Sequence, residues 1–117
     1  MKYAFVMTEV FDAVWAQIGY ADDELRELQN ELLKNPEKGR VMQGAGGFRK
    51  MRFRLPNAGK SGGVRVIYLN LPASEIIYLL MAYPKSEKAD LSPSECGELK
   101  AIATTIREHY KNANKGV

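Results

Sequence analysis

Residues 44–68 read GAGGFRKMRFRLPNAGKSGGVRVIY, and they hold the pattern from which the fold can be predicted. From Lys50 onward, charged and apolar residues alternate. The cations are Lys50, Arg52 and Arg54, and the apolar residues between them are Met51, Phe53 and Leu55. A period of two is typical of a half-buried strand, so we predict a strand with a cationic outer row. The segment 56–63, PNAGKSGG, is rich in residues typical of a loop.

Two further strands are predicted after this loop. Residues 64–71 are almost all apolar and β-branched or aromatic, which indicates a strand covered on both faces, apart from Arg65 near its start. A turn at residues 71–74 leads into a third strand over residues 75–83. Because consecutive strands with short connections usually pair with each other, we predict an antiparallel meander.

Helices are predicted on either side of the meander. A short strand at residues 3–7 precedes Thr8, a good N-cap for a helix that Gly19 ends. A second helix begins at the acidic residues 22–24 and is closed by Pro36 and Gly39. The third begins at Ser92, where SPSE has the form of a capping box.

These elements predict the order β-α-α-β-β-β-α in a single domain over residues 1–117, with residues 112–117 as a flexible tail. The fold class is α+β, with the helices packed on one face of a twisted, mainly antiparallel sheet. A chain of this length can bury a core without disulfides or a structural metal.

The charge of the chain is strongly segregated. Residues 38–74 contain eight Lys or Arg and no Asp or Glu, whereas the remainder has nine cations and fourteen acids. A local charge of +8 is thus hidden behind a net charge of +3. A basic surface of this kind is expected of a protein that binds phosphates.

Several site classes are disfavoured by the sequence. Gly59-Lys60-Ser61 lacks the earlier glycine and the following helix of a phosphate-binding P-loop. The single Cys96 and single His109 lie on the predicted third helix, and no Cys/His cluster has metal-ligand spacing. We therefore expect no metal and no other cofactor. No signal peptide or membrane-length apolar run is present, so a cytoplasmic protein is expected.

The available chemistry is narrow, because the basic zone offers no carboxylate pair. RNA carries its own nucleophile, the 2′-OH, so cleavage without a metal needs alignment, proton transfer and stabilisation of charge on the phosphate. Arg65 near the start of an apolar strand indicates an anionic ligand or partner. Three hypotheses remain open: a merely solvated cationic face, a nucleic-acid-binding domain without activity, and RNA cleavage.

Three stretches resemble the RelE superfamily of bacterial toxins, in particular its HigB-like branch. They are GAGGFRKMRFR (44–54), GKSGGVRVIY (59–68) and IYLLMAYPKSEKADLS (77–92). The resemblance implies the toxin of a type II toxin–antitoxin system. It would be a ribosome-dependent mRNA endonuclease, neutralised by an antitoxin that in this branch usually carries a helix-turn-helix domain. Cleavage would leave a cyclic phosphate.

The resemblance also implies roles for residues. The paired strand cations of the family fall on Lys50 and Arg52, its phosphate-stabilising arginine on Arg65, and the basic link after the last strand supplies Lys85 and Lys88. We expect these five to be catalytic, and expect RNA binding by three further cations: Arg49, Arg54 and Lys60.

Two family positions differ in this chain. Ser86 stands where RelE has an arginine, and Ser92 stands where RelE has a catalytic tyrosine. The proton donor and acceptor therefore stay open among Lys50, Lys60, Lys85 and Lys88, with Tyr83 as an outside candidate. Two alternatives to the nuclease remain: a ParE-like toxin that inhibits DNA gyrase, and a basic RNA-binding domain without catalysis.

Overall fold

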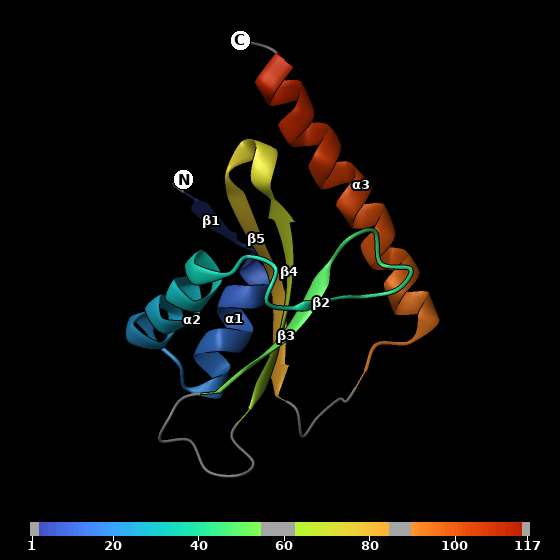
Figure 1. The fold of residues 1–117 in the computed structure, drawn as a ribbon. Coiled ribbons are helices and arrows are strands. Elements are labelled where there is room, and N and C mark those ends of the chain that lie inside the picture. Colours follow the sequence, from blue (N-terminus) through green and yellow to red (C-terminus); the bar gives the residue numbers. More distant parts are fainter. Residues whose placement is uncertain (1–2, 55–62, 85–89, 116–117) are drawn as a thin grey trace.

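The computed structural model describes residues 3–54, 63–84 and 90–115. These residues form five strands, three α-helices and one short 3-10 helix (Figure 1). Their order is β1 (Ala4–Met7), α1 (Glu9–Ile18), α2 (Asp22–Lys34), β2 (Arg40–Val41), β3 (Arg49–Phe53), β4 (Val64–Leu71), η1 (Pro72–Ser74), β5 (Ile76–Pro84) and α3 (Pro93–Lys115). Among these helices, none is long and apolar enough to cross a membrane.

The strands form one mixed sheet in the order β1-β5-β4-β3-β2. The predicted meander is confirmed, because β3 pairs antiparallel with β4 and β4 antiparallel with β5. β1 pairs parallel with β5 at the edge of the sheet. Ile67 pairs with Met81 but Tyr68 pairs with Leu79, so Leu80 is an extra residue that forms a bulge.

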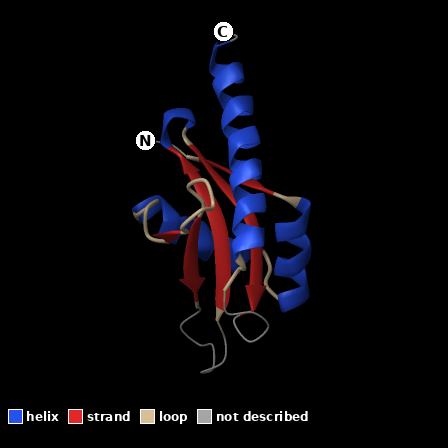
Figure 2. Cartoon of the chain, turned by 90° about the vertical axis from the view of Figure 1, so that its right-hand side faces the viewer, coloured by secondary structure: helices blue, strands red, loops and turns tan. Residues whose placement is uncertain are grey.

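Each face of the sheet carries its own core. The core on the α1 and α2 side contains buried residues of both helices, β3, β4 and β5, including Phe11, Leu28, Phe53 and Tyr68. The core on the other side contains Phe48, residues of β4 and β5, and the α3 residues Leu99, Ala103 and Ile106. Figure 2 shows α3 running along the sheet.

The expectation that all helices pack on one face is therefore wrong: α3 lies on the face opposite to α1 and α2 (Figure 1). The physical reason is β4, which is apolar on both faces and would expose half of its side chains if only one face were covered. α3 includes residues 112–115 of the segment expected as a flexible tail, and residues 116–117 lie outside the described residues.

The predicted helix ends are confirmed in detail. The Thr8 hydroxyl accepts the Phe11 N–H at 2.9 Å, and Gly19 ends α1 with φ of 97°. At α3 the Ser92 N–H donates to the Glu95 carboxylate at 2.8 Å, and the Glu95 N–H donates to the Ser92 hydroxyl at 3.1 Å. This is the capping box that the sequence predicts.

The segment before β3 contains two features that were not predicted. Residues 40–41 form the short edge strand β2, in which Arg40 pairs with Lys50. The turn that follows lies directly on α3. A Cβ at Gly46, whose φ is +70°, would come within 2.9 Å of the Ala103 Cβ and the Lys100 Cα. Only glycine permits both this backbone conformation and this close approach.

Candidate nucleic-acid interface

Two of the three cations of β3, Lys50 and Arg52, lie on one face of the sheet. Lys50 is half-buried and Arg52 is exposed, whereas Met51 and Phe53 between them belong to the core under α1 and α2. Lys50 and Arg52 thus point away from that core, toward the α3 side. The predicted cationic row is confirmed at these two positions. Arg54 follows the strand and is exposed, and Leu55 lies outside the described residues.

Strand register brings Arg65 to this row. Arg52 is the direct partner of Arg65 across β3 and β4, and Arg65 is in turn the partner of Tyr83 on β5. Residues opposite each other on neighbouring strands project to the same face. The convergence of Arg65 with Lys50 and Arg52, predicted from the sequence, is therefore confirmed.

These side chains line a hollow of about 480 Å³, which we call the cationic hollow. Its lining residues come from the segment between α2 and β2, from β2, β3 and β4, and from the segment before α3: Lys38, Arg40, Lys50, Met51, Arg52, Arg65 and Asp90. Five of the seven are cations and one is an acid. Such a cluster favours an anion with several oxygens, because each guanidinium can donate two parallel hydrogen bonds to a phosphate.

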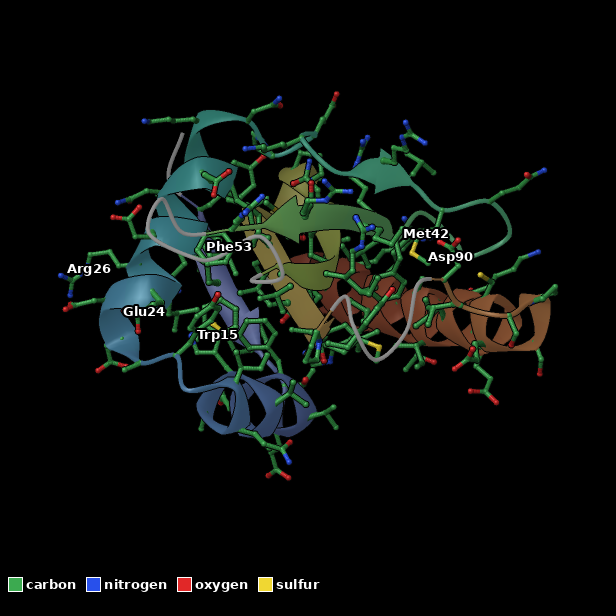
Figure 3. All side chains as sticks on the ribbon, turned by 90° about the horizontal axis from the view of Figure 1, so that it is seen from below. Trp15, Glu24, Arg26, Met42, Phe53 and Asp90 are labelled. Carbon is green, nitrogen blue, oxygen red and sulfur yellow. The ribbon has the colours of Figure 1, made fainter. Side chains whose placement is uncertain are left out.

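Asp90 is the acid of the cationic hollow, and its carboxylate forms an ion pair with the Lys50 ammonium group. The hydrogen bond from Lys50 and its charge hold the pKa of Asp90 below its ordinary value, and the charge of Arg65 adds to this effect. Figure 3 shows Asp90 beside Met42, apart from Trp15 and Phe53 on the α1 side. Asp90 thus adds one acid to the basic zone, 40 residues after Lys50 in the sequence, and no second carboxylate is among the described residues that line the hollow.

Arg49 lies apart from the cationic hollow. Its guanidinium donates to the backbone carbonyl oxygens of Gly39 at 2.8 Å and Glu37 at 3.3 Å. These carbonyls lie just after α2, on the chain that leads to β2. Arg49 therefore holds the segment that presents Lys38 and Arg40, and its predicted contact with RNA stays a prediction.

Tyr68 supports the same segment from β4. Its hydroxyl donates to the Pro36 carbonyl oxygen at 2.9 Å and accepts the Gly39 N–H at 2.8 Å. The residue has no exposed surface. Burial raises the pKa of Tyr68, although the Gly39 N–H and the charge of Arg49 counteract part of this effect. The phenol is therefore a neutral clamp between β4 and the end of α2.

Arg65 and its cross-strand partner Tyr83 lie next to Arg52 on the same face of the sheet. The Arg65 Nε and the Tyr83 hydroxyl are both buried, and neither has a hydrogen-bond partner among the residues described. Burial raises the pKa of Tyr83, the charge of Arg65 lowers it, and Asp90 and Glu95 raise it again. A phenol of this kind keeps its proton near pH 7 and is a poor general base. Its predicted role in proton transfer remains a prediction.

Of the remaining residues singled out in the sequence, three lie outside the described residues and two do not line the cationic hollow. Lys60, Lys85 and Lys88 lie outside the described residues. Cys96 is half-buried against the core under α3, and His109 is exposed with its ring edge-on to Tyr110. Within the described part of the chain, no group of three His, Cys, Asp or Glu could hold a metal ion.

Sequence reasoning missed three residues of the cationic hollow: Lys38, Arg40 and Asp90. The first two open the acid-free stretch, so their charge was visible, but their place depends on the two-residue strand β2. Little in the sequence indicated that Asp90 reaches the cationic hollow, because it is separated from Lys50 by 40 residues and directly precedes the start of the predicted third helix.

Comparison with known proteins identifies the family. A family model described as the RelE toxin of the RelE/RelB toxin–antitoxin system matches residues 8–115. Among solved structures, the intact E. coli RelBE toxin–antitoxin complex contains a chain with TM-score 0.50 and 17% identity, over 76% of this chain and 99% of that chain. A mutant of the E. coli toxin RelE in the free state matches with TM-score 0.49 and 13% identity, over 75% and 88% of the two chains. The family match covers nearly the whole chain, and the chain therefore belongs to the RelE toxin family.

Proposed function

We propose that this protein is a ribosome-dependent mRNA endonuclease, in which the cationic hollow holds the phosphate that is cleaved. The observation that carries the proposal is the convergence of Lys50, Arg52 and Arg65 from two paired strands around one hollow. Toxins of the RelE family in general cleave mRNA, and a cationic site built on rigid strands fits that activity. The likeness to the HigB branch stays a prediction made from the three sequence stretches.

The proposed reaction uses the 2′-OH of the RNA as its nucleophile and no metal. Attack on the adjacent phosphorus forms a bond to the 2′-oxygen and breaks the bond to the 5′-oxygen, which leaves a cyclic phosphate. The phosphate gains negative charge in the transition state, and fixed cations stabilise that charge without reorganisation. Arg65 is the best placed for this task, because it is half-buried and lies between Arg52 and Tyr83.

Proton transfer is proposed to involve lysines. A base must take the proton of the 2′-OH, and an acid must supply one to the 5′-oxygen. Lys50 lies in the cationic hollow, where its ammonium group forms an ion pair with Asp90. Lys85 and Lys88, proposed from the family resemblance, belong to the link between β5 and α3.

We further propose two macromolecular partners. The first is mRNA on the ribosome, whose backbone the cationic hollow would contact. The second is an antitoxin, as the RelBE complex suggests by analogy, and the HigB-like sequence stretches favour one with a helix-turn-helix domain. Both proposals are compatible with a cytoplasmic protein that needs no small-molecule cofactor.

The test is the variant Arg65→Ala in a bacterial translation extract, with mRNA cleavage mapped at 5′ ends. We expect the cleavage rate to fall about 100- to 1000-fold, as for the loss of one oxyanion-stabilising donor. Arg26→Ala is the matched control, since Arg26 is exposed on α2, on the far side from Asp90 (Figure 3). Circular dichroism checks that both variants stay folded. Undiminished cleavage by Arg65→Ala would remove its assigned role.

The same assay separates the nuclease from the alternatives. Cuts in phase with codons, lost when initiation is blocked, are expected of a ribosome-dependent nuclease. Intact mRNA together with inhibited DNA supercoiling would instead support a ParE-like toxin. Intact mRNA with retained RNA binding would support a binding domain without catalysis.

A further inference from the structure

A second concave surface lies between α1, β5 and α3, and we call it the apolar groove. It encloses about 310 Å³ between the start of α1, the middle of β5 and the first half of α3. The residues lining it come from these three elements and from the entry to α3: Thr8, Val10, Leu80, Met81, Leu91, Glu95, Glu98, Leu99 and Ile102. It shares none of these residues with the cationic hollow.

Two apolar side chains on opposite walls of the apolar groove face solvent. Val10 of α1 is 58% exposed and Ile102 of α3 is 39% exposed. The structure describes only two other large apolar residues that are this open, Leu33 and Val41, and each stands on a different surface. An exposed apolar strip with a hollow centre is typical of a docking site.

The charges around the apolar groove are acidic. Glu95 and Glu98 belong to its lining, Glu9 precedes Val10, and no Lys or Arg is among the described residues that line it. The carboxylate of Glu95 is already engaged by the N–H of Ser92, whereas Glu98 is exposed. This surface would repel a nucleic-acid backbone and attract a cationic peptide.

We propose that the apolar groove is the docking surface for a cationic amphipathic helix of the antitoxin. Apolar residues of such a helix, repeating every three or four positions, would fill the space between Val10 and Ile102, and a flanking Lys or Arg would meet Glu98. The identification of the antitoxin as the source of this helix rests on the proposed function. The chemistry of the surface does not depend on it.

The location has a consequence for inhibition. Leu91 lines the apolar groove and also a hollow of about 390 Å³ that includes Arg40, Lys50 and Asp90. Through Leu91 the apolar groove therefore adjoins a hollow that shares Arg40, Lys50 and Asp90 with the cationic hollow. An antitoxin held there would obstruct the approach of the toxin to the ribosome without having to fill the cationic hollow.

The first experiment measures binding of a synthetic helix with leucine at every third or fourth position and lysine at the flanking positions. Fluorescence anisotropy compares it with the counterpart in which glutamate replaces lysine. We expect Ile102→Asp to weaken binding of the lysine peptide about tenfold or more, because a large apolar contact is lost. Glu98→Lys is expected to weaken it about fivefold or more through charge reversal at the rim.

Matched controls make the same changes elsewhere. Leu33→Asp alters a residue of α2 that is 45% exposed, and Glu27→Lys alters an exposed carboxylate of α2. Both should bind the lysine peptide as the unaltered protein does. Equal binding of the glutamate peptide, unchanged binding by Ile102→Asp, or equal losses in the controls would overturn the proposal. A dimer of the free protein that Ile102→Asp dissociates would overturn it as well, since a second copy would then occupy the groove.

The second experiment uses the antitoxin itself. The toxin carries Arg65→Ala to limit toxicity, and the antitoxin is co-expressed and co-purified with each groove variant. Reduced recovery with Ile102→Asp and Glu98→Lys, but not with the two controls, supports the proposal, and full recovery overturns it. Cleavage of mRNA is measured separately on toxins that retain Arg65. Absence of cleavage by the unaltered protein would refute the proposed enzyme and leave the binding result unaffected.

Discussion

Replacement of Asp90 by asparagine is predicted to tighten RNA binding. Asp90 is the single acid among the described residues that line the cationic hollow, and its carboxylate forms an ion pair with the Lys50 ammonium group. An RNA phosphate must compete with this carboxylate for Lys50. The variant Asp90→Asn keeps a side chain of nearly the same size but removes the charge. Lys50 then becomes available for one further phosphate contact.

The magnitude follows from counterion release. For single-stranded nucleic acid, the logarithm of the binding constant falls by about 0.7 per phosphate contact for each decade of salt. If affinity near 1 M salt is unchanged, one extra contact increases affinity about fivefold at about 0.1 M salt and about twofold at about 0.4 M. The slope of the salt dependence should therefore become steeper by about 0.7.

The assay is fluorescence anisotropy with a labelled 2′-O-methyl RNA, which cannot be cleaved through the 2′-OH. Affinity is measured over a salt series for the unaltered protein and for Asp90→Asn. Asp12→Asn is the matched control, because Asp12 is an exposed aspartate on α1. Its charge lies outside the residues that line the cationic hollow, so little change is expected.

A double-mutant cycle tests the cause. In a Lys50→Ala background the effect of Asp90→Asn should nearly vanish, because the ammonium group that pairs with Asp90 is absent. An unchanged salt slope for Asp90→Asn would refute the competition between Asp90 and phosphate. An equal gain in the Lys50→Ala background would show that Asp90 acts through the general field and not through Lys50.

Three further predictions concern the support of the site. Tyr68→Phe should lower the free energy of unfolding by about 1–3 kcal/mol in urea titrations, because the buried Gly39 N–H loses its acceptor and the half-buried Pro36 carbonyl loses its donor, whereas half-buried Tyr78→Phe should change it little. Burial raises the pKa values of Tyr68 and Tyr83, so stability present below about pH 10 should decline as pH rises through the folded-state values, and a flat profile would contradict this. Gly46→Ala should destabilise the protein by at least about 1 kcal/mol, because its Cβ meets the Ala103 Cβ at 2.9 Å in a left-handed backbone conformation; an unchanged thermal midpoint would refute this reasoning.

Local patterns were sufficient for much of the fold. Alternation from Lys50 to Phe53 predicted the face of each residue, since side chains of a strand alternate strictly. The same alternation places Arg49 on the opposite face of the strand from Lys50. In the structure the Arg49 guanidinium donates to the Gly39 carbonyl oxygen and not into the cationic hollow. The caps at Thr8 and Ser92 were predictable because their hydrogen bonds span only three residues.

Long-range geometry was less accessible. The covered faces of β4 indicated packing on both sides, yet no local pattern showed which helix would supply the second layer. The two-residue strand β2 is too short to show any period. Its pairing with β3 is nevertheless what brings Arg40 beside Lys50.

The sequence by itself determined that this chain forms an α+β domain with a cationic strand row, because period, caps and charge segregation are properties of neighbouring residues. Only the tertiary structure decided that Lys38 and Arg40 extend that row, that Asp90 pairs with Lys50, and that an apolar groove flanked by glutamates lies between α1, β5 and α3. These features join residues far apart in the chain. Their positions depend on strand register and on the placement of Asp90 and α3 against the sheet, which no local pattern encodes.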